Sequence, residues 1–148
     1  MPILADLASC RPVCGKSRTM IGKTMEKFLY ISIGAILGAN ARYWLGDWVA
    51  QKWGTAFPFG TLIINVSGSL LLGFFLTIST ERFLVDPRLR LMIAIGFLGA
   101  YTTFSTYSME SYNLIAHGQW AYGLLNLLGS TLLGFLAVTL GILLGKWL

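Results

Sequence analysis

The amino-acid sequence predicts an all-α membrane protein with four transmembrane helices, on three observations. Of the 148 residues, 55% are hydrophobic and only 11% are charged, against roughly 25% charged in an average soluble domain. Glycine accounts for 17 residues, and in membrane helices small residues let backbones approach closely. Four apolar segments also recur between short polar loops, each near the roughly 20 residues that cross the hydrocarbon core.

The first 27 residues differ from the rest in carrying several basic residues and two prolines. They contain no apolar stretch of about 7–15 residues such as a signal peptide needs. We therefore predict a disordered basic extension over residues 1–27 and a transmembrane domain over residues 28–148. Cys10 and Cys14 are interpreted as an incidental pair, because a metal site usually adds a second pair or a nearby histidine.

The first predicted crossing covers residues 28–49 and contains two closely spaced glycines, Gly34 and Gly38. This spacing favours close packing against another helix. Arg42 follows near the end of the segment. Its cation is interpreted either as snorkelling to lipid headgroups or as standing at a pore mouth, where it would concentrate anions.

The second predicted crossing covers residues 59–80 and places the amide of Asn65 among apolar residues. Such an amide can join helices by hydrogen bonds or donate into a water-filled path. We favour the second interpretation because Thr61, Gly68 and Ser69 can share its helical face.

The third predicted crossing covers residues 89–116, which is longer than a single straight crossing requires. In its middle, residues 99–103 combine glycine with β-branched threonines, which disfavour helix, so we predict a break there. Main-chain carbonyls freed by such breaks coordinate Na⁺ in some membrane proteins. Past the break, Phe104 and Tyr107 share a face at i, i+3 spacing, and the positive edges of aromatic rings can solvate a small anion. Glu110 extends this face.

The fourth predicted crossing covers residues 121–144 and carries several polar side chains among leucines and glycines. Thr131 can hydrogen-bond the carbonyl four residues earlier, so hydroxyl groups here do not by themselves indicate a pore. His117, before this crossing, is interpreted as a surface residue.

The distribution of Lys and Arg bears on orientation, because four crossings place both termini on one side. Nine basic residues would lie on that side and two, Arg42 and Lys52, on the other. The nine are Arg11, Lys16, Arg18, Lys23, Lys27, Arg82, Arg88, Arg90 and Lys146. The positive-inside rule then predicts cytoplasmic termini. Translation from Met20 or Met25 is an alternative, and a start at Met25 would reduce the bias to five against two.

The run Gly-Phe-Leu-Gly-Ala-Tyr-Thr-Thr-Phe-Ser-Thr-Tyr-Ser-Met-Glu over residues 96–110, with Asn65 in Gly-Thr-Leu-Ile-Ile-Asn, resembles the Fluc (CrcB) family of fluoride channels. The likeness extends over residues 28–146. It implies a passive, fluoride-selective channel in the cell membrane of a prokaryote, which exports fluoride to lower its intracellular concentration. It also implies an antiparallel homodimer of dual topology, with two pores along its interface.

The resemblance further implies a structural Na⁺ at the dimer centre, which is not transported. Its ligands would be the main-chain carbonyls of Gly99 and Thr102 from each subunit. Fluoride would pass a set of weak donors and the acid of a polar track, which we assign to Asn65, Phe104, Tyr107, Ser108 and Glu110. Tyr107 departs from the family's phenylalanine but keeps the positive ring edge.

Two other functions remain open on the residues alone. A small proton-coupled multidrug or cation exporter, also a four-helix dimer, would use Glu110 for proton coupling. A membrane assembly subunit would use the polar run only to join helices. We do not expect an enzyme, because the sequence offers no nucleophile–base pair, metal cluster or cofactor loop, nor a nucleic-acid partner, because it lacks a basic stripe with interleaved aromatics.

Overall fold

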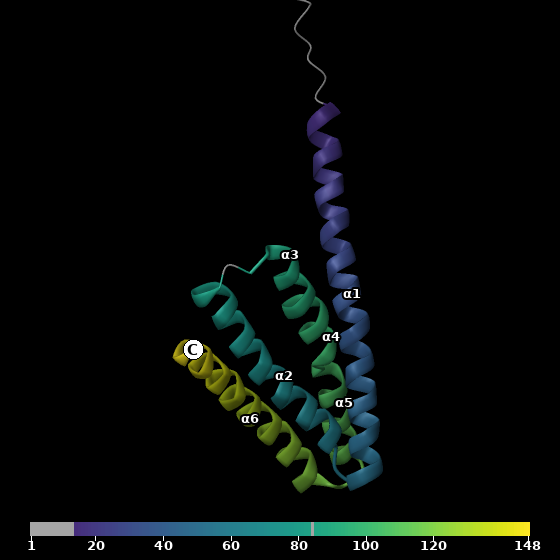
Figure 1. Ribbon diagram of the computed structural model, residues 1–148. Coiled ribbons are helices and arrows are strands. Elements are labelled where there is room, and N and C mark those ends of the chain that lie inside the picture. Colours follow the sequence, from purple (N-terminus) through teal and green to yellow (C-terminus); the bar gives the residue numbers. More distant parts are fainter. Residues whose placement is uncertain (1–13, 84) are drawn as a thin grey trace, which may run out of the picture.

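The computed structural model describes residues 14–83 and 85–148, and within them the regular structure is helical throughout. In chain order the elements are α1 (Cys14–Trp53), α2 (Phe59–Thr77), the π-helical η1 (Ile78–Arg82), α3 (Pro87–Arg90), the π-helical η2 (Leu91–Leu98), α4 (Gly99–Tyr101), α5 (Phe104–Ala116) and α6 (Trp120–Trp147). The chain runs up and down the molecule, with the α1–α2 and α5–α6 connections at the same end (Figure 1).

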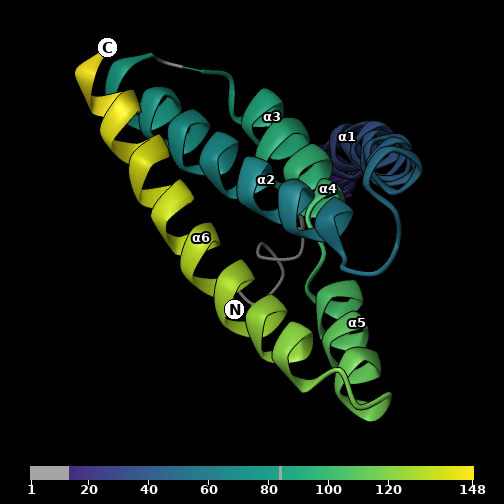
Figure 2. The ribbon, with the colours of Figure 1, turned by 90° about the horizontal axis from the view of Figure 1, so that it is seen from below.

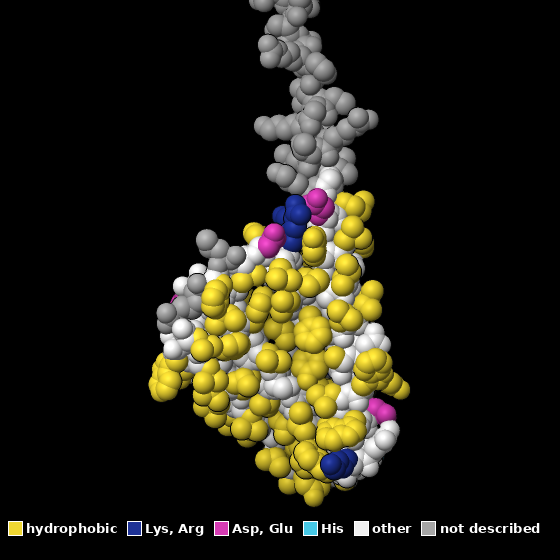
Figure 3. Space-filling model, viewed as in Figure 1, with side chains coloured by type: hydrophobic (Ala, Val, Ile, Leu, Met, Phe, Trp, Pro, Cys, Tyr) yellow, Lys and Arg dark blue, Asp and Glu magenta, His cyan; other side chains and the backbone are white. Residues whose placement is uncertain are grey.

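Three helical segments of the described residues are long and apolar enough to cross a membrane: Phe59–Glu81, Pro87–Ala116 and Trp120–Trp147. They contain the second, third and fourth predicted crossings. Hydrophobic side chains cover the middle of the molecule, and the visible charged side chains gather at its two ends (Figure 3). The protein is therefore an all-α, multi-pass membrane protein. The first predicted crossing lies inside α1. This helix is not among the three segments, and Asn40 and Arg42 lower its mean hydropathy.

Helix α1 begins much earlier than the predicted crossing. The structure makes residues 14–27 helical, which differs from the prediction of a disordered extension over residues 1–27. Half of residues 14–27 are Lys, Arg, Met or Glu, which favour helix, so these turns can extend the apolar part of α1 toward the N-terminus. An ion pair of 3.0 Å between Arg88 Nη2 and Glu26 Oε2 joins this part of α1 to α3. Residues 1–13, with Cys10, lie outside the described part.

Glycines bring α1 close to the third crossing. A Cβ added at Gly34 would lie 2.0 Å from the Met92 carbonyl oxygen, and one at Gly38 would lie 2.1 Å from that of Phe97. On the third crossing Gly96 also lacks a side chain, so its Cα lies close to Gly34 of α1. The prediction that this glycine pair permits close helix packing is therefore confirmed within the chain.

Helices α2 and α6 pack together in the same manner. A Cβ at Gly73 would lie 2.4 Å from the Val138 carbonyl oxygen, and one at Gly141 would lie 2.2 Å from that of Leu70. Seen from below, α6 lies beside α2, and α1 lies on the far side of α3 and α4 (Figure 2). One glycine-based contact therefore joins α1 to the third crossing, and a second joins α2 to α6.

The third crossing is interrupted between α4 and α5, where the sequence predicts a break. Thr102 has ψ of 155° and Thr103 has φ of −148°, so two residues are extended and the helical hydrogen bonds stop. The prediction of a third helix broken near its middle is confirmed.

Substitution of Gly38 by Val tests the close packing of α1. The added side chain would overlap the Phe97 carbonyl oxygen, so we expect a loss of about 1–3 kcal/mol, the usual cost of overpacking. Thermal unfolding of the detergent-solubilised protein measures it. Gly22→Ala is the matched control, since the same helix leaves open space around that Cα; equal unfolding midpoints for both variants would contradict the packing argument.

Candidate functional site

The side chain of Asn65 on α2 hydrogen-bonds the backbone at the break in the third crossing. Its Oδ1 accepts a 2.8 Å hydrogen bond from the N–H of Thr103, and its Nδ2 donates a 3.2 Å bond to the carbonyl of the same residue. Thr103 is extended, so its N–H and C=O face the same side, as in a strand pairing with a neighbour. The amide of Asn65 therefore takes the place of a neighbouring peptide group.

Helix α5 restarts with a side-chain cap from Thr103. The Thr103 hydroxyl accepts a 3.2 Å bond from the N–H of Thr106 and donates a 2.8 Å bond to the Thr106 hydroxyl. This is the usual way in which a threonine satisfies the first free N–H groups of a helix. The capping role of Thr103 was missed in the sequence, although a threonine three residues before another polar residue could have suggested it.

The missing side chain of Gly68 leaves room for the residues at the break. A Cβ at this position of α2 would lie 2.3 Å from the Thr102 Cγ2 and 3.1 Å from the Tyr101 Cδ1. Thr61, Asn65 and Gly68 thus all face the third crossing from one side of α2, as their spacing predicts. Ser69, which was expected to share this face, lies 3.7 Å from the Cβ position of Gly134 on α6.

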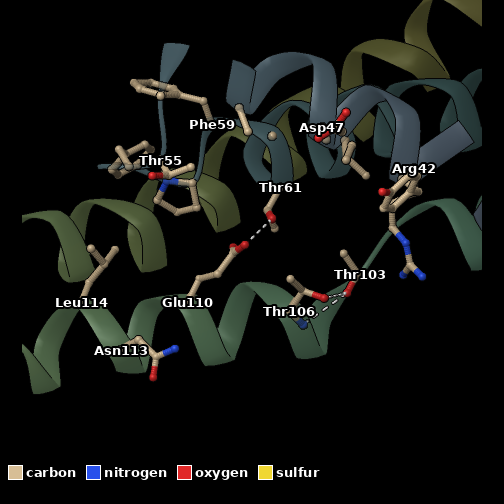
Figure 4. A pocket seen from close by; sticks show the side chains of 18 of the residues that line it. Arg42, Asp47, Thr55, Phe59, Thr61, Thr103, Thr106, Glu110, Asn113 and Leu114 are labelled. Carbon is tan, nitrogen blue, oxygen red and sulfur yellow. Dashed lines mark hydrogen bonds between the residues drawn. The ribbon is translucent and has the colours of Figure 1, made fainter. Parts of the chain in front are cut away.

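A cavity of about 820 Å³ leads from the α1–α2 loop to the break. It is lined by polar side chains from three elements, as Figure 4 shows: Arg42 and Asp47 from α1, Thr61 from α2, and Thr103, Thr106, Glu110 and Asn113 from the break and α5. Because it carries both cationic and anionic groups, it can hold water and small ions at this end of the molecule.

Glu110 reaches from α5 toward α2 across this cavity (Figure 4). Its Oε1 accepts a 2.8 Å hydrogen bond from the hydroxyl of Thr61. Its Oε2 is buried and has no hydrogen-bond partner in the described part of the chain. One oxygen of the acid is therefore fixed, and the other is available to a mobile donor such as water.

The two aromatic rings past the break lie next to each other, with centroids 5.6 Å apart and ring planes tilted by 51°. Phe104 is 80% exposed in the single chain. Tyr107 is buried, and its hydroxyl lies 3.1 Å from the Leu127 carbonyl oxygen, to which it donates, and 3.2 Å from the Thr131 hydroxyl. The phenol of Tyr107 thus points its oxygen into α6 and leaves the ring beside Phe104.

A fully buried polar cluster, not assigned from the sequence, joins α5 to α6. Asn126 donates a 2.9 Å bond to the Ser111 hydroxyl and accepts a 3.2 Å bond from that of Ser130. Ser111 in turn donates to the carbonyl of Tyr107 at 2.8 Å. The i, i+4 spacing of Asn126 and Ser130 was the available signal. Thr131 donates to the Leu127 carbonyl at 2.7 Å, as predicted from its position.

The structure brings only some of the predicted site residues to the cavity. Arg42 and Glu110 line it, and so does His117, which was assigned no role. Asn65 does not line the cavity but binds the N–H and the C=O of Thr103, which does, and Thr102 comes directly before Thr103 in the break. Gly99 begins α4, one turn before the break.

The remaining predicted site residues lie on α5 outside the cavity. Within the described residues, Phe104, Tyr107 and Ser108 do not line it. The hydroxyl of Ser108 donates a 2.9 Å bond to the Phe104 carbonyl within the same helix. Because these residues alternate along α5 with Thr103, Thr106 and Glu110, which do line the cavity, a path past them would follow a face of α5 that turns away from the cavity.

Comparison with known proteins matches residues 29–142 to the family model described as CrcB-like protein, Camphor Resistance (CrcB). A relative from Synechococcus sp. (strain JA-2-3B'a(2-13)) is 44% identical over 86% of this chain and 98% of its own length. A relative from Trichormus variabilis is 47% identical over 83% of this chain and 90% of its own length. A relative from Koribacter versatilis is 49% identical over 77% of this chain and 90% of its own length. Each of the three is named as a fluoride-specific ion channel.

These matches span the helices that carry the break, the Asn65 side chain that binds it, and the cavity. The first relative is matched along almost its whole length. The chain belongs to the CrcB family.

Proposed function

We propose that this chain forms a passive, fluoride-selective channel that exports fluoride across the cell membrane. The observation that carries the proposal is the break at Thr102 and Thr103, which sets amide, hydroxyl and aromatic groups inside an apolar crossing. Polar groups at membrane depth are costly and are usually functional. The names of the matched relatives point to the same ion.

The donors near the break suit a small, strongly hydrated anion. An amide NH₂ has two N–H bonds, and Asn65 uses one of them for Thr103, so one remains for an ion. The ring edges of Phe104 and Tyr107 add weak positive potential. Several modest donors can replace hydration water and still release the ion, which conduction requires. A negative-inside membrane potential favours the exit of an anion.

The cavity serves in this proposal as the entrance for the ion. Arg42 is half-buried at its wall and raises the local anion concentration. The pore then continues along α5 past Phe104, Tyr107 and Ser108, with Glu110 and Thr61 forming a polar pair beside it.

We further propose that two copies pair in opposite orientations, each with four crossings that include residues 28–49 of α1. The exposed ring of Phe104 supports pairing, because a ring edge exposed to acyl chains would have no anion path beside it. The nine-to-two charge bias favours a single orientation, so translation from Met25 would suit dual insertion better.

A structural Na⁺ completes the proposal. The N–H of Thr103 donates to Asn65, whereas in an unbroken helix it would donate to the carbonyl of Gly99. The break therefore releases the Gly99 and Thr102 carbonyls, and carbonyl oxygens at such breaks coordinate Na⁺. The bound ion would supply fixed positive charge at the centre of the dimer.

Fluoride efflux from loaded liposomes tests the channel. We expect rapid efflux that continues when proton gradients are dissipated, since permeation is passive. Absence of efflux would support an assembly role instead, and efflux that stops with the proton gradient would support an exporter.

Phe104→Ile should lower fluoride efflux at least tenfold while the dimer still assembles, because the substitution removes a ring edge and keeps most of the bulk. The efflux assay measures the rate, and size-exclusion chromatography measures assembly. Phe28→Ile is the matched control, since Phe28 is also well exposed but lies far from the break. If the Phe104→Ile variant shows the efflux rate of the wild type, the ring of Phe104 does not line the pore.

Tyr107→Phe should largely preserve efflux, because the ring edge remains. It should destabilise the protein by about 0.5–1.5 kcal/mol, the usual value of a hydrogen bond, since the bonds to Leu127 and Thr131 on α6 are lost. Efflux and thermal unfolding measure the two effects separately. A collapse of efflux at unchanged stability would show that the hydroxyl itself serves the ion.

Replacement of Na⁺ by a large organic cation on both sides should slow efflux severalfold, because such a cation cannot fit between carbonyl oxygens. Restoring Na⁺ should recover the rate. Equal rates in both media would reject the Gly99 and Thr102 site and leave the channel itself in place.

A further inference from the structure

We infer that Asn65 is a positioning residue for the sodium site. Its two hydrogen bonds to Thr103, here called the clamp, orient the Thr102 carbonyl toward the ion. This inference rests on the proposed sodium site and adds a second task to a residue otherwise assigned to the fluoride path. It follows from which peptide group Asn65 binds.

The Thr103 N–H and the Thr102 carbonyl belong to one peptide unit. A trans peptide is planar, and its N–H and C=O point in opposite directions; the described chain has no cis peptide bond. Because the N–H points at the Asn65 Oδ1 over 2.8 Å, the Thr102 oxygen must point away from Asn65. The direction of the proposed ligand is thus set by a side chain on another helix.

The second bond of the clamp fixes the peptide unit that follows Thr103. Asn65 Nδ2 holds the carbonyl of Thr103 at 3.2 Å, so both sides of this extended residue are fixed by one rigid amide. The direction of the Thr102 carbonyl itself depends on the first bond, because only the Thr103 N–H shares its planar peptide unit.

The other polar groups of Thr102 are already engaged, which leaves the carbonyl to face the ion. Its N–H and its hydroxyl both donate to the Leu98 carbonyl, at 3.1 and 3.0 Å. Its methyl group fits against Gly68, where a Cβ would lie 2.3 Å away. Side chain and N–H therefore turn back toward α4 and α2, and the carbonyl is the group without such a constraint.

The clamp also makes the carbonyl a better ligand. A peptide whose N–H donates a hydrogen bond carries more negative charge on its oxygen, since hydrogen bonds in a chain polarise one another. Loss of the acceptor at position 65 would therefore weaken sodium binding in two ways: the peptide could turn, and its oxygen would be less polarised.

Two substitutions separate this role from a role in the fluoride path. Asn65→Asp keeps an oxygen for the Thr103 N–H but places negative charge beside the anion path; Asn65→Leu keeps the size and removes the acceptor. We expect Asn65→Asp to lower maximal fluoride efflux with the half-maximal Na⁺ concentration within about twofold of wild type. Asn65→Leu should raise that concentration at least fivefold, as loss of a buried hydrogen bond predicts.

Sodium-dependent thermal stabilisation of the purified dimer measures the same affinity without flux, so the test holds even if Asn65→Leu does not conduct. Asn126→Leu is the matched control: it also removes a buried amide with side-chain partners, and it should lower stability without changing the half-maximal Na⁺ concentration.

An unchanged Na⁺ requirement of Asn65→Leu in both measurements would overturn the inference. Wild-type protein that is indifferent to Na⁺ in both would remove the sodium site and this inference together, with the fluoride channel intact. Wild-type protein without fluoride efflux would reject the proposed function, and the Na⁺-dependent unfolding shift would still decide whether Asn65 supports a cation site.

Discussion

The structure depends on one constraint: peptide groups inside an apolar crossing need partners within the protein, because lipid offers none. At Thr102 and Thr103 the helix stops supplying them. A single amide, Asn65, takes over for both polar groups of Thr103, and the Thr103 hydroxyl starts the next helix. The break is consequently a fixed element of the fold, with a defined backbone direction on each side.

One face of α2 supports nearly everything around this break. Thr61 holds the acid of Glu110, Asn65 holds Thr103, and Gly68 makes room for Thr102. These three positions follow each other at four- and three-residue spacing, so a rigid helix sets their relative places. The close glycine contacts of α2 with α6, and of α1 with the third crossing, keep that face in position.

Much of this arrangement can be predicted from the sequence because it depends on local chemistry. Gly99 followed by β-branched residues predicts the break, and the spacing around Asn65 predicts the shared face of α2. Long-range partners are not encoded in this way: nothing in the sequence pairs Asn126 with Ser111, or turns the Tyr107 hydroxyl toward Leu127. The helical start of α1 at Cys14 was missed because basic composition was interpreted as disorder, although the same residues favour helix.

The cavity is bordered by the α1–α2 loop and the α5–α6 turn, so it lies at one end of the molecule. A single copy would therefore offer this cavity to ions on one side of the bilayer. Inverting the second copy would give both compartments an identical entrance. The proposed pair of opposite orientation would have no structural rectification, and the direction of net flow would be left to the electrochemical gradient.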